Sequence, residues 1–115
     1  MGYDVLLVED EALVRHGLRS ALEQEGWLTV VGEAGEGRTG VTRFSELQPD
    51  IVLMDVAMDG MSGHQATRLM KEEDPSAQVI ALSVYQDRDM VLRLFESGVD
   101  GYVPKKSAYQ ELLHA

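Results

Sequence analysis

The stretch "IVLMD", residues 51–55, places four apolar side chains directly before a single carboxylate, Asp55. A short, continuous apolar run of this kind is typical of a strand that is buried on both faces of a parallel sheet. The sequence Met58-Asp59-Gly60 follows closely and predicts a loop. Asp55 is therefore expected at the tip of a buried strand, where the chain enters a loop.

Four further segments have the length and apolar content of strands: Asp4–Val8, Leu28–Ala34, Gln78–Val84 and Gly101–Val103. Apolar residues at helical spacing separate these segments. The four stripes are Val14, Leu18, Ala21 and Leu22; Val41, Phe44 and Leu47; Ala66, Leu69 and Met70; and Val91, Leu94 and Phe95. Ser62 and Gln65 fit a capping box at the third helix, Gly98 fits a C-cap of the fourth, and residues 107–115 predict the start of a fifth helix.

Strict alternation of strand and helix requires right-handed crossovers and a parallel sheet that is covered on both faces. The expected fold is therefore a doubly wound α/β domain with a five-stranded, flavodoxin-like sheet in the order 2-1-3-4-5. A chain of 115 residues is long enough for one such domain and too short for two.

The charge balance excludes several functions. Ten Lys and Arg against twenty Asp and Glu give a formal net charge of -10, so these residues alone should not bind nucleic acid. The chain has no cysteine, which excludes a disulfide framework, a thiolate nucleophile and a cysteine-based zinc site. No apolar run approaches the roughly 20 residues that span a bilayer, and acids occur early in the amino-terminal segment. We expect a cytoplasmic protein that does not enter a membrane.

Carboxylates follow two of the predicted strands, at the point where an open parallel sheet binds its ligands. Glu9 and Asp10 come directly after the first strand, and Asp55 ends the third. Three acids that converge there would repel one another unless a cation lay among them, and a small cluster of oxygen ligands suits Mg²⁺. Taken singly, Glu9 and Asp10 could instead cap the first helix, and Asp55 could begin an Asx turn.

Two other strand tips carry polar groups that could meet an anion beside these acids. The hydroxyl of Ser83 stands near the end of the fourth predicted strand, and Lys105 comes just after the fifth. A lysine beside a cluster of acids is more than helix capping requires, so the combination favours a functional site.

The ordered set of motifs resembles the receiver domain of two-component response regulators. "LLVEDE" resembles the acid pair of that family, "DIVLMDVAMDGMSG" its phospho-acceptor strand and loop, "ALSV" its hydroxyl position, and "GVDGYVPK" its aromatic residue and lysine. The resemblance covers essentially the whole chain. The segments "LLVEDEALVRHGL", "LSVYQD" and "GYVPK" are most similar to NarL-type (LuxR-family) transcriptional regulators, which carry a carboxy-terminal helix-turn-helix domain.

This resemblance implies a role for each candidate residue. Asp55 would accept a phosphoryl group from a sensor histidine kinase, and Glu9, Asp10, Asp55 and the backbone carbonyl of Ala57 would bind Mg²⁺. Lys105 and Ser83 would contact the phosphoryl group, and Ser83 with Tyr102 would form the switch. A homodimer could form on phosphorylation, and an output helix-turn-helix domain is expected beyond residue 115.

Three positions depart from the family pattern. Asp59 stands where the family usually has proline, so the loop loses a rigid residue and gains a charge. Ala57 has no polar side chain to orient a hydrolytic water, which hints at a long-lived phosphoryl group. Lys106 stands where the NarL type often has an acid.

Two rival classes of function remain open. A phosphatase of the haloacid-dehalogenase type also forms an aspartyl phosphate, but it needs a second Asp where this chain has Ala57. A receiver-like module could also bind its partners without phosphorylation, although the complete set of candidate residues argues against this alternative.

Overall fold

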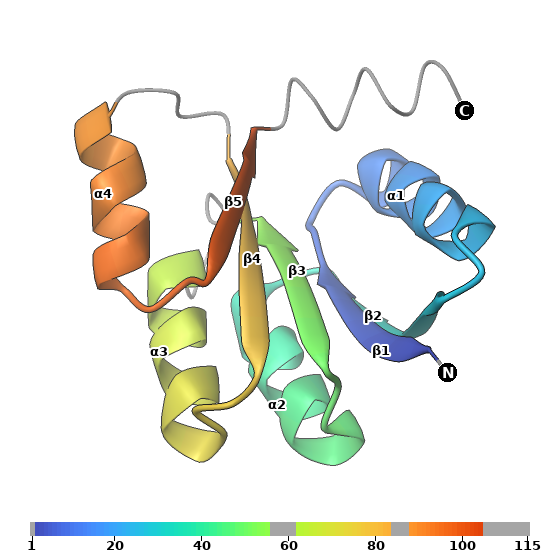
Figure 1. The fold of residues 1–115 in the computed structure, drawn as a ribbon, viewed down its shortest axis with the longest axis horizontal. Helices are drawn as coiled ribbons and strands as arrows, with labels where there is room; N and C mark the ends of the chain where they lie inside the picture. Colours follow the sequence, from blue (N-terminus) through green and yellow to red (C-terminus); the bar gives the residue numbers. More distant parts are fainter. Residues whose placement is uncertain (1, 56–61, 84–87, 105–115) are drawn as a thin grey trace.

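The computed structural model describes residues 2–55, 62–83 and 88–104. They form strands β1 (Tyr3–Val8), β2 (Leu28–Ala34), β3 (Ile51–Asp55), β4 (Gln78–Ser83) and β5 (Gly101–Pro104). They also form helices α1 (Ala12–Gln24), α2 (Gly37–Leu47), α3 (Gly63–Glu73) and α4 (Arg88–Glu96), in strict alternation with the strands (Figure 1).

The strands form one parallel sheet in the order β2-β1-β3-β4-β5. This arrangement confirms the predicted doubly wound fold and places the reversal of strand order between β1 and β3. In the register, Val8 of β1 pairs with Met54 of β3, and Asp55 pairs with Leu82 of β4. The ends of β1, β3 and β4 consequently lie side by side at one edge of the sheet.

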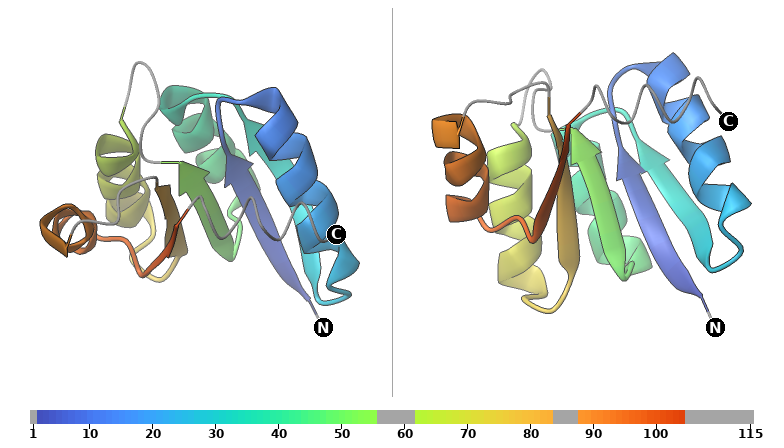
Figure 2. Two further views of the ribbon diagram at one scale, coloured as in Figure 1. Left: turned by 90° about the horizontal axis from the view of Figure 1, so that it is seen from above. Right: turned by 45° about the horizontal axis from the view of Figure 1, so that its top comes forward.

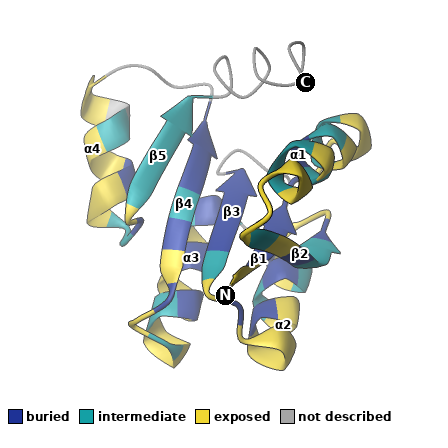
Figure 3. Cartoon of the chain, turned by 45° about the vertical axis from the view of Figure 1, so that its right-hand side comes forward, coloured by how far each residue is buried: buried dark blue, intermediate teal, exposed yellow. Residues whose placement is uncertain are grey.

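Alternate residues of the strands build two cores, one on each face of the sheet. Leu6, Val8, Val52, Met54 and Ala81 pack with residues of α2, α3 and α4. Val5, Leu7, Leu53 and Leu82 pack with Leu18 of α1 on the other face. The two turned views show this separation of α1 from the other helices (Figure 2), and the burial colours show that β3 and β4 are buried over most of their length (Figure 3).

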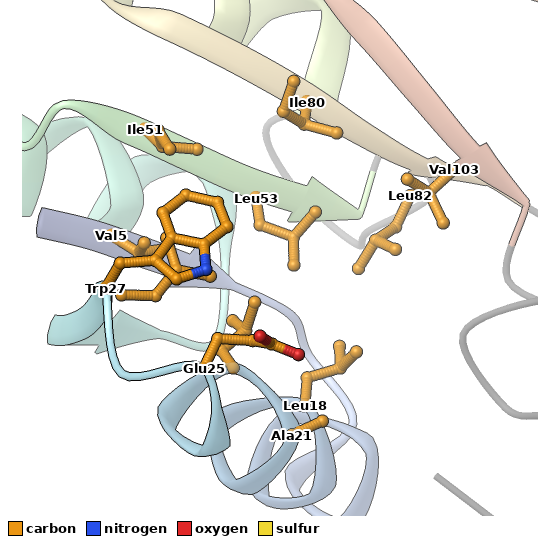
Figure 4. A pocket seen from close by; sticks show the side chains of 12 residues that line it. Val5, Leu18, Ala21, Glu25, Trp27, Ile51, Leu53, Ile80, Leu82 and Val103 are labelled. Atoms are coloured by element: carbon orange, nitrogen blue, oxygen red, sulfur yellow. The ribbon is translucent and has the colours of Figure 1, made fainter. Parts of the chain in front are cut away.

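An apolar groove of about 370 Å³ lies on the α1 face of the sheet (Figure 4). Leu18 and Ala21 line it from α1, Leu53 and Leu82 line it from the strands, and the ring of Trp27 borders it. Trp27 is half exposed and packs edge-on against Tyr3, with 6.0 Å between the ring centroids. The tryptophan is thus a half-exposed residue that packs at the border of the groove.

The local signals at the helix ends are confirmed. Ser62 Oγ accepts a hydrogen bond from the Gln65 N–H at 3.2 Å, and Gln65 Oε1 accepts one from the Ser62 N–H at 3.3 Å, which completes the capping box of α3. Gly98 follows α4 with a φ of 110°, a left-handed conformation that favours glycine. The predicted helix over residues 107–115 and the end of the predicted strand at Val84 lie outside the described residues.

Three leucine and phenylalanine positions of the predicted apolar stripes are exposed rather than buried: Leu47, Leu69 and Phe95. On α3, Thr67 is buried instead, so the buried stripe consists of Gly63, Ala66, Thr67 and Met70. A helix that packs on a sheet buries only a narrow stripe of side chains. Leu69 directly precedes the buried Met70, and Phe95 directly follows the buried Leu94, so both side chains are rotated away from the sheet. None of the described helices has the length and apolar content that a membrane span requires.

We predict that Phe44→Ala destabilises the domain by about 3 to 5 kcal/mol, because it empties the largest fully buried side-chain site. Urea denaturation followed by far-UV circular dichroism measures this change. Leu13→Ala is the control: Leu13 is 86% exposed on α1, and its truncation should change the free energy of unfolding by less than about 0.5 kcal/mol. Equal losses in the two variants would contradict the assignment of the core.

Candidate functional site

Asp55 is the last residue of β3, the central strand of the sheet. Its side chain is 1% exposed, and its strand is paired with β1 on one side and β4 on the other. The four residues before it are apolar and pack into the two cores, so the strand has little freedom to move. The sequence therefore places a carboxylate on a rigid support at the edge of the sheet where ligands bind.

Glu9 and Asp10 continue from the end of β1 beside Asp55. The Glu9 N–H extends the β1–β2 ladder by donating to the Ala34 carbonyl at 2.9 Å. The Glu9 side chain is fully buried, and its Oε1 accepts a hydrogen bond from the Glu11 N–H at 3.3 Å. Asp10 is exposed. One buried and one exposed acid thus approach the tip of β3 from the neighbouring strand.

The three acids form a cluster with the geometry of a cation site. One carboxylate oxygen from each of Glu9, Asp10 and Asp55 can be chosen so that all three lie within 4.8 Å of one another. Like charges at this spacing repel, and the repulsion is greater where burial lowers the local dielectric constant. A hard divalent cation with oxygen ligands removes that repulsion, so the donor set fits Mg²⁺.

Neither Glu9 nor Asp10 is the N-cap residue of α1. The N-cap residue of α1 is Glu11, and its side chain makes no capping hydrogen bond. Glu9 contributes one hydrogen bond to the Glu11 N–H, which does not require a second acid at position 10. The Asx-turn alternative for Asp55 concerns residues that follow it and lie outside the described ranges.

Ser83 and Tyr102 lie on neighbouring strands and on the same face of the sheet. Ser83 is the last residue of β4 and is fully buried, two residues after Ala81, whose partner in the ladder is Tyr102. Residues two apart in a strand point to the same face, and Tyr102 packs against the core that includes Ala81 and Leu94 of α4. Lys105, Ala57, Asp59 and Lys106 lie outside the described residues.

The sequence analysis did not predict an ion pair that lies beside the acids, between Arg15 of α1 and Glu33 of β2. The Arg15 Nη1 donates to the Glu9 carbonyl at 2.6 Å, and its Nε lies 3.2 Å from Glu33 Oε1. A signal was available for Arg15, which is the only Arg or Lys among residues 12–17, close to the acid pair in the sequence. Glu33 could not be placed, because its orientation depends on an irregularity in β2.

The comparison with protein families decides what this site belongs to. Residues 5–115 match the model of the response regulator receiver domain. The chain belongs to this family. Membership in this family favours a signalling domain over a phosphatase of the haloacid-dehalogenase type.

Relatives place this receiver domain near the LuxR/NarL-type regulators. It is 36% identical over 115 residues to the response regulator protein VraR of Staphylococcus saprophyticus, with all of this chain and 55% of the relative covered. It is 39% identical over 111 residues to the transcriptional regulatory protein LiaR of Bacillus subtilis, with 96% of this chain and 53% of that protein covered. The chain thus spans about half the length of the curated relatives it matches.

A solved structure of the LuxR family has the same fold. A two-component response regulator of the LuxR family from Aurantimonas sp. SI85-9A1 superposes with a TM-score of 0.90 at 34% identity. The superposition covers 100% of this chain and 82% of that one. Receiver domains bind Mg²⁺ at an acidic cluster, and this receiver domain has such a cluster in Glu9, Asp10 and Asp55.

We predict that Asp10→Asn stabilises the metal-free domain by about 1 kcal/mol, the size of the repulsion between unit charges a few ångströms apart in a water-like medium. Urea denaturation in EDTA at low ionic strength measures the change. Glu46→Gln removes the same charge from an exposed position on α2, and we expect it to change stability by less than about 0.5 kcal/mol. A destabilised Asp10→Asn variant would show that the cluster is not under like-charge repulsion.

Proposed function

We propose that this receiver domain is a phosphorylation switch that accepts a phosphoryl group on Asp55 from a sensor histidine kinase. The observation that carries the proposal is the convergence of Glu9, Asp10 and Asp55 within 4.8 Å at the strand-order reversal of the sheet. Capping of α1 does not account for this cluster, whereas phosphoryl transfer to a carboxylate requires it, because three negative groups and an incoming phosphate must be neutralised together.

In the proposed reaction, one carboxylate oxygen of Asp55 attacks the phosphorus atom of the kinase's phosphohistidine. A phosphorus–oxygen bond forms, the phosphorus–nitrogen bond breaks, and the electron pair stays with the imidazole of the kinase. Glu9, Asp10, Asp55 and the backbone carbonyl of Ala57 would hold Mg²⁺. When bound, Mg²⁺ supplies positive charge that neutralises the transferring group.

The protein's own groups would position and neutralise the phosphoryl group. Asp55 is fixed at the end of a strand that is paired on both sides, so its attack needs little loss of conformational freedom. Ser83 would donate its hydroxyl to a phosphoryl oxygen, and Lys105 would pair with the phosphate as a point charge. The domain would thus catalyse only its own phosphoryl transfer and dephosphorylation.

The partners follow from the same proposal. The domain would meet its kinase in the cytoplasm, could form a homodimer on phosphorylation, and would control a carboxy-terminal helix-turn-helix domain in a longer protein. The relationship to LuxR/NarL-type regulators supports this output. DNA would be bound by the output domain, since the formal net charge of residues 1–115 is -10.

We predict that the parent chain, incubated with Mg²⁺ and a small acyl-phosphate donor, gains one phosphoryl group. The acyl phosphate replaces the kinase as donor, so intact-protein mass spectrometry tests the acceptor without a partner. Asp55→Asn should gain none, because an amide is not a nucleophile for this transfer, and EDTA should abolish the gain in the parent. Added mass that survives in Asp55→Asn would overturn the assignment of Asp55.

We predict that Ser83→Ala separates phosphorylation from switching. Loss of the hydroxyl leaves the carboxylate and the metal ligands intact, so most of the phosphorylation should remain. Without the contact between Ser83 and the phosphoryl group, phosphorylation should no longer change the packing of Tyr102. Phosphorylation-dependent NMR shifts in residues 91–103 should therefore be smaller than in the parent. Lys105→Ala should have the same effect. If both variants show the same phosphorylation-dependent NMR shifts as the parent, Ser83 and Tyr102 do not form the switch.

A further inference from the structure

We propose that Arg15 is a positioning residue for the metal site, which holds Glu9 and Asp10 in their metal-binding arrangement by tying the peptide between them to Glu33 on β2. This inference rests on the proposed Mg²⁺-dependent function of the same site. It assigns to the α1–β2 side of the domain a part in metal binding that the acid cluster alone does not show.

The peptide between Glu9 and Asp10 lies where the β1 ladder ends. The Glu9 N–H still pairs with the Ala34 carbonyl of β2 at 2.9 Å. The Glu9 carbonyl is bound by the Arg15 Nη1 at 2.6 Å, a charge-assisted hydrogen bond. Because this carbonyl belongs to the peptide that joins the two acids, the bond fixes the direction in which the chain carries Asp10 away from the buried Glu9.

Glu33 anchors the other side of the Arg15 guanidinium. The Arg15 Nε lies 3.2 Å from Glu33 Oε1, and each side chain is 24% exposed, so the pair is partly shielded from water. A planar guanidinium can bind a carbonyl and a carboxylate at once in a fixed relative orientation, which a lysine ammonium on a flexible stem cannot. Arg15 therefore links the β1–α1 connection, through the Glu9 carbonyl, to Glu33 of β2.

An irregularity in β2 is what turns Glu33 toward α1. The β1–β2 register shifts between Val5, which pairs with Val30, and Leu6, which pairs with Gly32. After this shift Glu33 pairs with Leu7, whose side chain belongs to the core on the α1 face. With regular alternation from Val30, Glu33 would point to the opposite face of the sheet. The shift thus brings a carboxylate to the helix that carries Arg15.

The charges around Arg15 decide the sign of its effect. A lone guanidinium beside the site would repel Mg²⁺ and weaken its binding. Here Glu33 contacts both Arg15 and Arg19, and Glu23 contacts Arg19 at 3.2 Å, so two arginines face two carboxylates. The hydrogen bond from Arg19 to Glu33 raises the pKa of the Arg19 guanidinium. The repulsion is therefore largely offset, and the positioning of the peptide remains as the net effect.

Arg19 supplies a matched control. It stands one turn after Arg15 on α1 and shares Glu33 as a partner, but its recorded bonds go to the side chains of Glu33 and Glu23. Arg19→Met thus removes the same charge and the same kind of ion pair as Arg15→Met. The difference between the two variants isolates the bond to the Glu9 carbonyl.

The experiment titrates the 115-residue chain with Mg²⁺ by isothermal calorimetry, with urea unfolding in EDTA measured in parallel. Arg15→Met should raise the Kd for Mg²⁺ roughly tenfold, the lower end of what outer partners of metal ligands contribute. Arg19→Met should change the Kd by less than about twofold, as exposed ion pairs usually do. A purely structural role would instead lower the metal-free stability and leave the Kd of the folded domain unchanged.

Two further variants keep the test decisive if Arg15→Met is unfolded without metal. Arg15→Lys keeps the charge and one donor but cannot bind both partners, and Glu33→Gln removes the carboxylate that orients and offsets Arg15. Both should bind Mg²⁺ more weakly than Arg19→Met does.

The outcomes separate this inference from the proposed function. If the parent chain binds Mg²⁺ and Arg15→Met binds it with the same or a lower Kd, the positioning role is overturned and the proposed function is not. The same conclusion follows if Arg15→Lys and Glu33→Gln both bind Mg²⁺ as tightly as the parent. A parent chain that binds no Mg²⁺ would overturn the proposed metal-dependent function and the positioning role with it.

Discussion

Three carboxylates at one edge of the sheet are held close enough to repel one another, and the architecture of the domain is what keeps them there. Glu9 and Asp55 are buried at the ends of β1 and β3, and Asp10 lies beside them. Acids on mobile loops would separate and lose the arrangement that attracts a divalent cation. Glu9 and Asp55 continue or end paired strands with apolar side chains packed on both faces, so separating their backbones would require moving the core itself. The repulsion among the acids therefore favours binding of a cation.

The two faces of the sheet serve this edge in different ways. On the α1 face, Arg15 and Glu33 bind the chain that leads from β1 to α1 and so support the acids directly. On the other face, Ser83 and Tyr102 lie on the side of the sheet that α2, α3 and α4 cover, where α4 contributes Leu94 to the core. The groups that support the acids and the two residues proposed to form the switch thus lie on opposite faces of the sheet.

The fold was predictable from sequence because its strands are short apolar runs at regular intervals. The β2 and α3 signals, Leu28–Ala34 and the capping box at Ser62, appear in the structure as expected. Exposure within the helices was harder to predict: Leu69 and Phe95 fit a helical period, but which residues of a stripe touch the sheet depends on how the helix is rotated against it. Hydrophobicity alone does not fix that rotation.

The acid cluster was predictable for a similar reason, since parallel strands end at one edge and their last residues must meet there. The ion pair of Arg15 and Glu33 beside this cluster was not predictable, because the position of Glu33 depends on one extra residue in β2. Alternation from Val30 directs Glu33 to the α2 face, whereas the register shift directs it to α1. A single unpaired residue thereby decides whether Arg15 has a carboxylate to bind. Local irregularities of this kind leave little trace in composition or periodicity, yet they determine which charged groups can support a site that the regular pattern creates.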